Sequence, residues 1–110
     1  MKPSEMSLFS AAEQKLLVDT ENARLEQLNE DDLAALLGRV RRSRNKYSDL
    51  HRRQGASAVR DAGKRYAAKT SNERTLRKAE IFDDAVSRVA RYLSRTARAN
   101  ANAIKEQRLE

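Results

Sequence analysis

Apolar side chains recur every three or four residues along most of this chain, which is the spacing of one face of an α-helix. The most regular run starts after Asn29 and comprises Leu33, Leu36, Val40, Ser43, Tyr47 and Leu50. A second run has the same spacing and comprises Ala79, Phe82, Val86, Val89, Leu93, Thr96, Asn100 and Ala103. Such runs are typical of helices that pack along a narrow seam. They predict long helices over residues 30–62 and 72–105.

A third, less regular helix is expected over residues 11–28. Ser10 and Glu13 form a capping box, in which the serine hydroxyl accepts from a backbone N–H and the glutamate accepts from the backbone N–H of the cap. The apolar face of this helix is irregular, and a break is expected near Asp19 and Thr20. Its expected buried residues are Leu16, Leu17, Ala23, Leu25 and Leu28.

The two long helices are expected to be joined by a polar, basic connection over residues 63–71. Gly63 can end the first helix. Thr70 and Glu73 form a second capping box, which places the start of the next helix at about residue 72. If the helix starts there, the backbone N–H groups of residues 71–73 are free to hold a phosphate.

These elements predict an all-α fold, in which a long antiparallel helical hairpin carries a shorter N-terminal helix as its third, bundle-like member. A single helical domain is expected over residues 10–110, after a flexible leader at residues 1–9. Hydrophobic residues make up 39% and aromatic residues only 5% of the chain, so the core should be thin. Because the seams include polar positions such as Ser43, Gln54 and Asn100, a second copy or another helical protein could add to their packing.

Charge is distributed very unevenly along the chain. Residues 39–78 hold 14 of the 23 Lys and Arg residues and only three acids, Asp49, Asp61 and Glu73, a net charge of +11. The first 38 residues have a net charge of −5. A basic block of this density repels itself unless a polyanion neutralises it, and nucleic acid is a common polyanion. One alternative is a charged face that only keeps the helices in solution.

The basic residues are expected to contact phosphates. Arg39, Lys46, Arg53 and Arg60 recur at every seventh position and should share one edge of a helix. Tyr47 and Tyr66 have rings that could stack on an unpaired base, although Tyr47 lies on the seam and is expected in the core. The candidate nucleic-acid-binding residues are Arg39, Arg42, Lys46, Arg52, Arg53, Arg60, Lys64, Arg65, Tyr66, Lys69, Arg74, Arg77 and Lys78.

Catalytic, metal and cofactor motifs are not found in the sequence. The chain has one histidine, His51, and no cysteine, which argues against a zinc site. Gly63 and Lys64 superficially resemble part of a phosphate-binding loop, but Arg65 stands where a Ser or Thr would hold magnesium. The adjacent acids Asp31–Asp32 and Asp83–Asp84 point apart on a helix. We therefore expect no enzyme activity, no cofactor and no small-molecule substrate.

The sequence favours a non-enzymatic protein that binds structured RNA or a ribosomal groove through phosphates, somewhat more than DNA. One alternative is a nucleoid-type or transcription-associated DNA-binding protein, which could be dimeric. Another is a helical module that binds an acidic protein. The acidic N-terminal segment is expected to compete for the basic face. The N-terminus does not resemble a signal peptide and no apolar run suits a membrane span, so a cytoplasmic location is expected.

Overall fold

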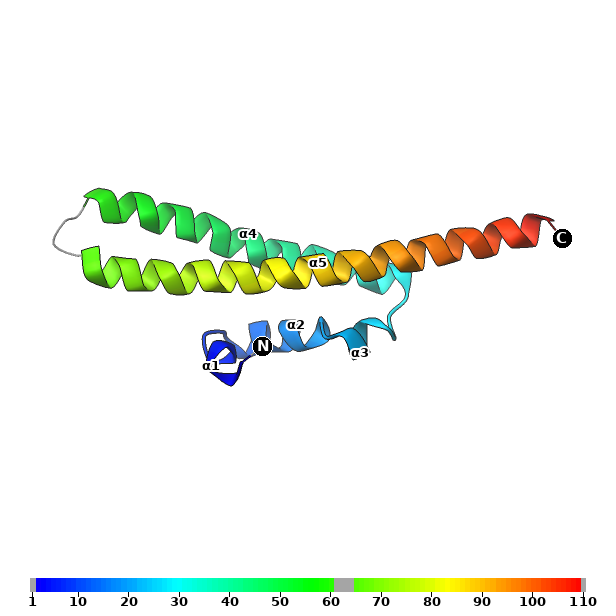
Figure 1. Cartoon of the computed structure of the whole chain (residues 1–110), viewed down its shortest axis with the longest axis horizontal. Helices are drawn as coiled ribbons and strands as arrows, with labels where there is room; N and C mark the ends of the chain where they lie inside the picture. The colour runs from blue at the N-terminus through cyan, green and yellow to red at the C-terminus, as the bar shows by residue number, and fades with distance from the viewer. Residues whose placement is uncertain (1, 61–64, 110) are drawn as a thin grey trace.

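The protein is an all-α molecule built around one helical hairpin (Figure 1). The structure is a computed structural model that describes residues 2–60 and 65–109; the side chains of residues 58–60, 65–68 and 109 are not described. Its helices are α1 (Pro3–Met6), α2 (Ala11–Asp19), α3 (Asn22–Leu25), α4 (Glu30–Arg60) and α5 (Arg65–Leu109). The chain measures 72 × 26 × 17 Å, which is the shape of a thin rod.

Helices α4 and α5 lie antiparallel, and residues 2–28, here called the arm, run along one side of this hairpin (Figure 1). The predicted hairpin with its shorter N-terminal helical segment is therefore confirmed. The seams are also as predicted over most of their length, because Leu33, Leu36, Val40, Tyr47, Ala79, Phe82, Val86 and Val89 are all buried. The predicted seam fails only at Asn100 and Ala103, which are exposed.

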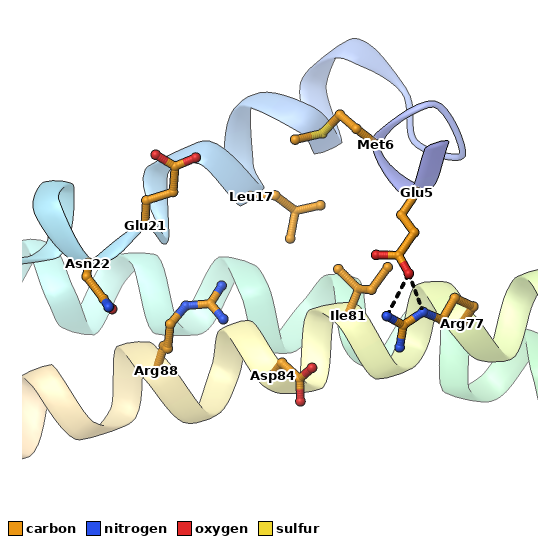
Figure 2. Close-up of a pocket in the computed structure, with 9 residues that line it drawn as sticks. All are labelled: Glu5, Met6, Leu17, Glu21, Asn22, Arg77, Ile81, Asp84 and Arg88. Carbon is orange, nitrogen blue, oxygen red and sulfur yellow. Dashed lines mark hydrogen bonds and ion pairs between the residues drawn. The ribbon is translucent and has the colours of Figure 1, made fainter. Parts of the chain in front are cut away.

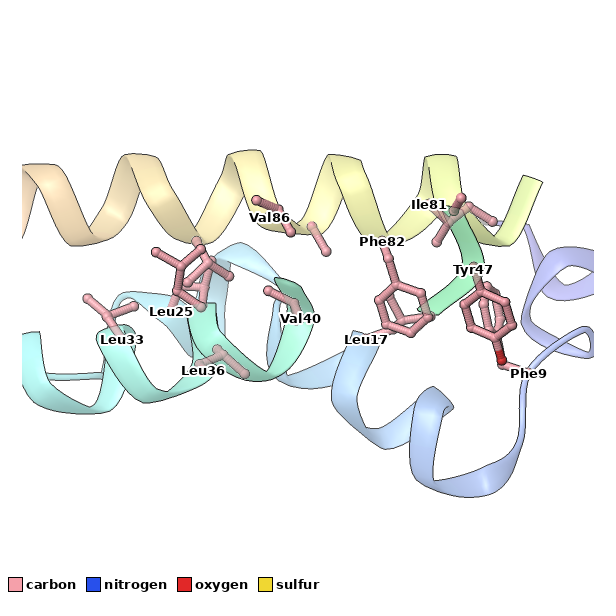
Figure 3. Packing of buried hydrophobic residues seen from close by; sticks show 14 residues of the cluster. Phe9, Leu17, Leu25, Leu33, Leu36, Val40, Tyr47, Ile81, Phe82 and Val86 are labelled. Carbon is pink, nitrogen blue, oxygen red and sulfur yellow. The ribbon is translucent and has the colours of Figure 1, made fainter. Parts of the chain in front are cut away.

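The core is centred on Phe82, whose side chain is 0% exposed (Figure 3). The Phe9 ring meets it edge-on at a centroid distance of 5.4 Å, and the Tyr47 ring lies stacked on it at 6.0 Å. These three rings come from the arm, α4 and α5, so one aromatic cluster joins all three parts of the molecule. Edge-on and offset aromatic pairs of this kind add about 0.5–1.5 kcal/mol each beyond their burial.

The start of α5 differs from the sequence prediction. The helix begins at Arg65 instead of residue 72, so the expected connection at 63–71 is helical from residue 65 onward. Ala67 and Ala68 are strong helix formers and no Gly or Pro separates them from Thr70, so the helix continues through the local capping signal. Residues 61–64, including the expected stop at Gly63, lie outside the described residues. At its other end α5 runs to Leu109, past the predicted end at residue 105.

The arm is less regular than a single helix over residues 11–28. The break expected near Thr20 is present, since α2 ends at Asp19 and α3 begins at Asn22. The expected burial of Ala23 is wrong, because its side chain is exposed. The expected leader contains α1, and Phe9 at its end is only 5% exposed. Packing of Phe9 on Phe82 orders this segment, and such a tertiary contact leaves no periodic signal in the sequence.

Candidate nucleic-acid interface

The basic row on α4 is laid out as the sequence predicted. Arg39, Lys46 and Arg53 are exposed and lie on one uninterrupted helix. Seven residues at 1.5 Å each separate neighbours by about 10 Å, and 3.6 residues per turn keep them on one edge. Arg42 is exposed beside this row, and Lys69 and Arg74 are exposed on α5. The side chains of Arg60, Lys64, Arg65 and Tyr66 lie outside the described residues.

Most of these cations lack an acidic partner. Arg39, Arg42, Arg53, Lys69 and Arg74 form no ion pair with any carboxylate that the structure describes. Some neighbouring cations are paired: Arg44 lies 3.5 Å from Asp83, Arg52 lies 2.5 Å from Asp49, and Arg77 contacts both Glu5 and Glu80. The unpaired cations repel one another and have free donors, so a polyanion would relieve the repulsion and satisfy the donors.

Tyr47 belongs to the core instead of to a base-stacking surface. Its ring is 5% exposed and is stacked against Phe82. The ammonium groups of Lys46 and Lys78 lie over this ring, 5.0 and 5.2 Å from its centroid. The expected core position of Tyr47 is therefore confirmed, and the alternative that its ring stacks on an unpaired base is wrong. The two lysines bring cations from α4 and α5 to the same place on the hairpin.

The expected phosphate cradle at residues 71–73 is also wrong. Because α5 begins at Arg65, these residues lie inside the helix and their N–H groups point along it toward carbonyls one turn earlier. Thr75, which is buried, donates from its hydroxyl to the carbonyl of Ser71. Any phosphate binding at this end of the hairpin therefore has to use side chains.

The acidic arm covers one of the candidate cations. A single carboxylate oxygen of Glu5 accepts from Arg77 Nη2 at 2.8 Å and from Arg77 Nε at 3.1 Å (Figure 2). The hydrogen bond from Arg77 is the main cause of the lowered pKa of Glu5. Among the described residues this is the only ion pair between the arm and the hairpin, although the charge of Lys46 in the α4 row also helps to lower the pKa of Glu13 in the arm.

A cleft of about 490 Å³ separates the arm from α5 beside this pair (Figure 2). Its walls carry both charges and its apolar floor includes Leu17 and Ile81. Arg88 already has hydrogen-bond partners in the arm: its Nε donates to the Thr20 carbonyl and its Nη2 to the Thr20 hydroxyl, each at 3.1 Å. Both arginines of the cleft thus bind the arm, and the cleft adds no free cation to the basic surface.

A partly buried polar layer of His51, Gln54 and Asn72 crosses the hairpin near the end where α4 stops and α5 begins, and sequence reasoning did not place it. His51 Nδ1 lies 3.3 Å from the Asn72 carbonyl oxygen, which can only accept, so Nδ1 is the donor. Gln54 Oε1 and Asn72 Oδ1 are buried with no hydrogen-bond partner among the described residues. Gln54 did mark a weakening of the seam in sequence, whereas Asn72 resembled a helix cap. Fewer apolar side chains are buried around this layer than around the aromatic cluster.

Neither a metal site nor a membrane-spanning helix is present among the residues that the structure describes. Within residues 2–60 and 65–109, no three His, Asp or Glu side chains are grouped as a metal site. No helix in those ranges is long and apolar enough to cross a bilayer. No protein-family model, curated protein or solved structure matches this chain.

Proposed function

We propose that this chain is a non-enzymatic nucleic-acid-binding protein that docks on phosphates through the basic surface of its hairpin. The observation that carries the proposal is the set of exposed cations on α4 and α5 that have no described acidic partner: Arg39, Arg42, Arg53, Lys69 and Arg74. Lys46 is a further exposed cation of the α4 row; it lies over the Tyr47 ring, and its charge also interacts with Glu13 of the arm. Arginine suits the role because its planar group can donate two parallel hydrogen bonds to one phosphate.

The shape of the hairpin favours docking on a surface over insertion into a duplex. The B-DNA major groove is about 12 Å wide and admits a single helix. The thinnest dimension of this rod is 17 Å, and its two long helices lie side by side. A protein of this shape would bridge phosphates across the grooves of a folded RNA, where recognition depends on shape more than on base edges. We therefore place structured RNA or a ribosomal groove ahead of DNA.

Binding of this kind depends steeply on salt. Each phosphate contact changes the slope of log K against log salt by about 0.7–0.9, so five contacts give a slope of about −4. The test is a fluorescence-anisotropy titration of a structured RNA, a duplex DNA and heparin at several salt concentrations. Tightest binding to the RNA with such a slope supports the proposal. Weak, salt-independent binding to all three refutes it.

A matched pair of variants separates the basic surface from total charge. Arg39→Gln with Arg53→Gln removes two cations from the α4 row, whereas Lys15→Gln with Arg24→Gln removes two exposed cations from the arm. Both variants lose the same net charge. We expect the first pair to reduce the salt slope by about two units and the second to leave it almost unchanged. Equal losses in both would mean that the α4 row is not the binding surface.

A further inference from the structure

Beyond the α4 row, α5 carries a second group of exposed cations that no acid balances. Residues 85–105 of this helix include no acid and five bases: Arg88, Arg91, Arg95, Arg98 and Lys105. Three of them, here called the α5 patch, are exposed and form no ion pair with any described carboxylate: Arg91, Arg95 and Arg98. Arg88 is not part of the patch, because it hydrogen-bonds the arm.

The α5 patch is one continuous surface, because its members follow at intervals of four and three residues and so share one helix face about 10 Å long. Together with Ser94 and Ala90 they line a hollow of about 460 Å³. The Arg95 guanidinium lies over the Tyr92 ring, 4.4 Å from its centroid. Arg98 Nε donates to the Ser94 carbonyl at 3.4 Å. These contacts orient two of the three guanidinium groups and leave N–H donors for a ligand.

The acids closest to the patch do not neutralise it. Glu26 in the arm accepts from the Tyr92 hydroxyl at 3.5 Å, but it forms no ion pair with the patch. The hollow is lined by α5 alone, so the acids at the start of α4 lie outside it: Glu30, Asp31 and Asp32. The patch therefore keeps an excess of positive charge that a bound anion could balance.

The α5 patch and the α4 row face opposite sides of the hairpin. Arg91 lies nine residues after the fully buried Phe82, which places it about 180° around α5 and directly away from α4. Arg53 lies thirteen residues after the fully buried Val40, which places it about 140° around α4 and away from α5. The rod is 17 Å thick along its shortest axis, and a short double-helical stem is too stiff to wrap around it. The two surfaces therefore suit two separate stems.

We propose that the α5 patch is a second phosphate-binding site, and that one chain holds two double-helical segments of nucleic acid, one on each side of the hairpin. This inference rests on the proposed function, since the α4 row provides the first site. A double helix carries one charge for about every 1.7 Å of its axis, so a patch about 10 Å long meets several phosphates. In a folded RNA the two segments would be neighbouring stems, whose mutual repulsion the cations between them would offset.

The make-up of the patch favours nucleic acid over an acidic protein. The centre of a protein interface is usually apolar and is dried around a few large anchor side chains. The hollow of the α5 patch is lined by its three arginines, Ser94 and Ala90, and it has no large apolar side chain. Arginine binds phosphate oxygens through its planar fork without needing such an apolar centre.

Fluorescence energy transfer between two RNAs tests this inference on the full chain. Donor- and acceptor-labelled copies of one short RNA stem-loop are mixed in equal amounts and titrated with protein at low salt. Energy transfer should rise while RNA is in excess and fall once protein is in excess, because each RNA then has a chain of its own. Arg91→Gln with Arg98→Gln should weaken capture of the second RNA at least about tenfold, since two charged contacts are lost. Anisotropy should show that this variant still binds the first RNA.

The matched control is Lys15→Gln with Arg24→Gln, which loses the same charge from exposed positions on the arm and should leave energy transfer almost unchanged. Equal losses in the two variants, or one RNA per chain at every ratio, would overturn the inference and leave the proposed function standing. Energy transfer that persists without Arg91 and Arg98 would overturn it too, because two associated chains would then hold the two RNAs.

A competitor separates the two classes of ligand. Polyglutamate added at equal charge should displace the second RNA much less effectively than unlabelled RNA does. Equal displacement by the two polymers would assign the α5 patch to an acidic protein and overturn the inference. Absence of any RNA binding by the unmodified chain would refute this inference and the proposed function together.

Discussion

Replacing Phe82 with alanine should be the most destabilising single truncation in the hairpin. Its side chain is 0% exposed and contacts rings from both other parts of the molecule, Phe9 at 5.4 Å and Tyr47 at 6.0 Å. Buried Phe→Ala changes cost about 3–5 kcal/mol, and the loss of two aromatic pairs places this site toward the upper end. Domains of this size have a free energy of unfolding of about 5–15 kcal/mol, so the variant would lose a large share of it.

Urea unfolding followed by far-UV circular dichroism measures this loss directly. Leu76→Ala is the matched control on the same helix, because Leu76 is 39% exposed and its truncation should cost less than about 1 kcal/mol. Phe82→Leu keeps most of the volume and should fall between the two variants. If Phe82→Ala lost no more than Leu76→Ala, the aromatic cluster could not be the centre of the core, and the seam assignment would be refuted.

Three further perturbations test the contacts around this core. Burial, followed by the hydrogen bond to Glu13, raises the pKa of Tyr47, so the folded state keeps a proton that the unfolded state releases near pH 10. Stability should therefore fall as the pH rises above about 10, and this fall should shrink in Tyr47→Phe; an identical alkaline profile would contradict the contact. Ser10→Ala removes the helix cap that accepts from the Glu13 N–H and should cost about 1 kcal/mol in urea unfolding, with no loss arguing against the capping box. Gln54→Leu combined with Asn72→Leu removes two buried, unpartnered oxygens, so it should increase the free energy of unfolding by about 1 kcal/mol and raise the thermal midpoint. A lower midpoint would show that water or another group satisfies these oxygens.

The seams could be predicted from the sequence because a two-helix interface buries one residue every three or four positions, and the apolar residues follow that spacing. Val40 and Val89 are identified by spacing alone and are both fully buried. The start of α5 could not be predicted from the sequence. Thr70 and Glu73 form a capping signal that indicates a start near residue 72, but the helix-favouring residues before them are part of the same helix. The basic row on α4 was also predictable, because a helix fixes which side chains share an edge.

The arm was the least predictable part, because tertiary contacts hold it in place. Arg88 reaches across to the buried Thr20, and Glu5 reaches Arg77 across more than half the chain. These pairs join residues whose separation in sequence follows no period. The burial of Ile81 could not be predicted from spacing either, since Ile81 lies off the predicted seam and is buried in the core cluster that includes residues of the arm.

The partly buried polar layer at His51, Gln54 and Asn72 implies a gradient of local stability along the rod. No described apolar side chain is fully buried between residues 48 and 57 of α4 or between residues 69 and 74 of α5. Segments with few buried apolar contacts open at lower free energy than the global unfolding reaction. Native-state hydrogen exchange should therefore show amides around His51 exchanging through local opening and amides around Val40 and Val89 only through complete unfolding. The two helices would therefore separate first at the end where α4 stops and α5 begins, and the distances from Arg53 on α4 to Lys69 and Arg74 on α5 would vary with that opening.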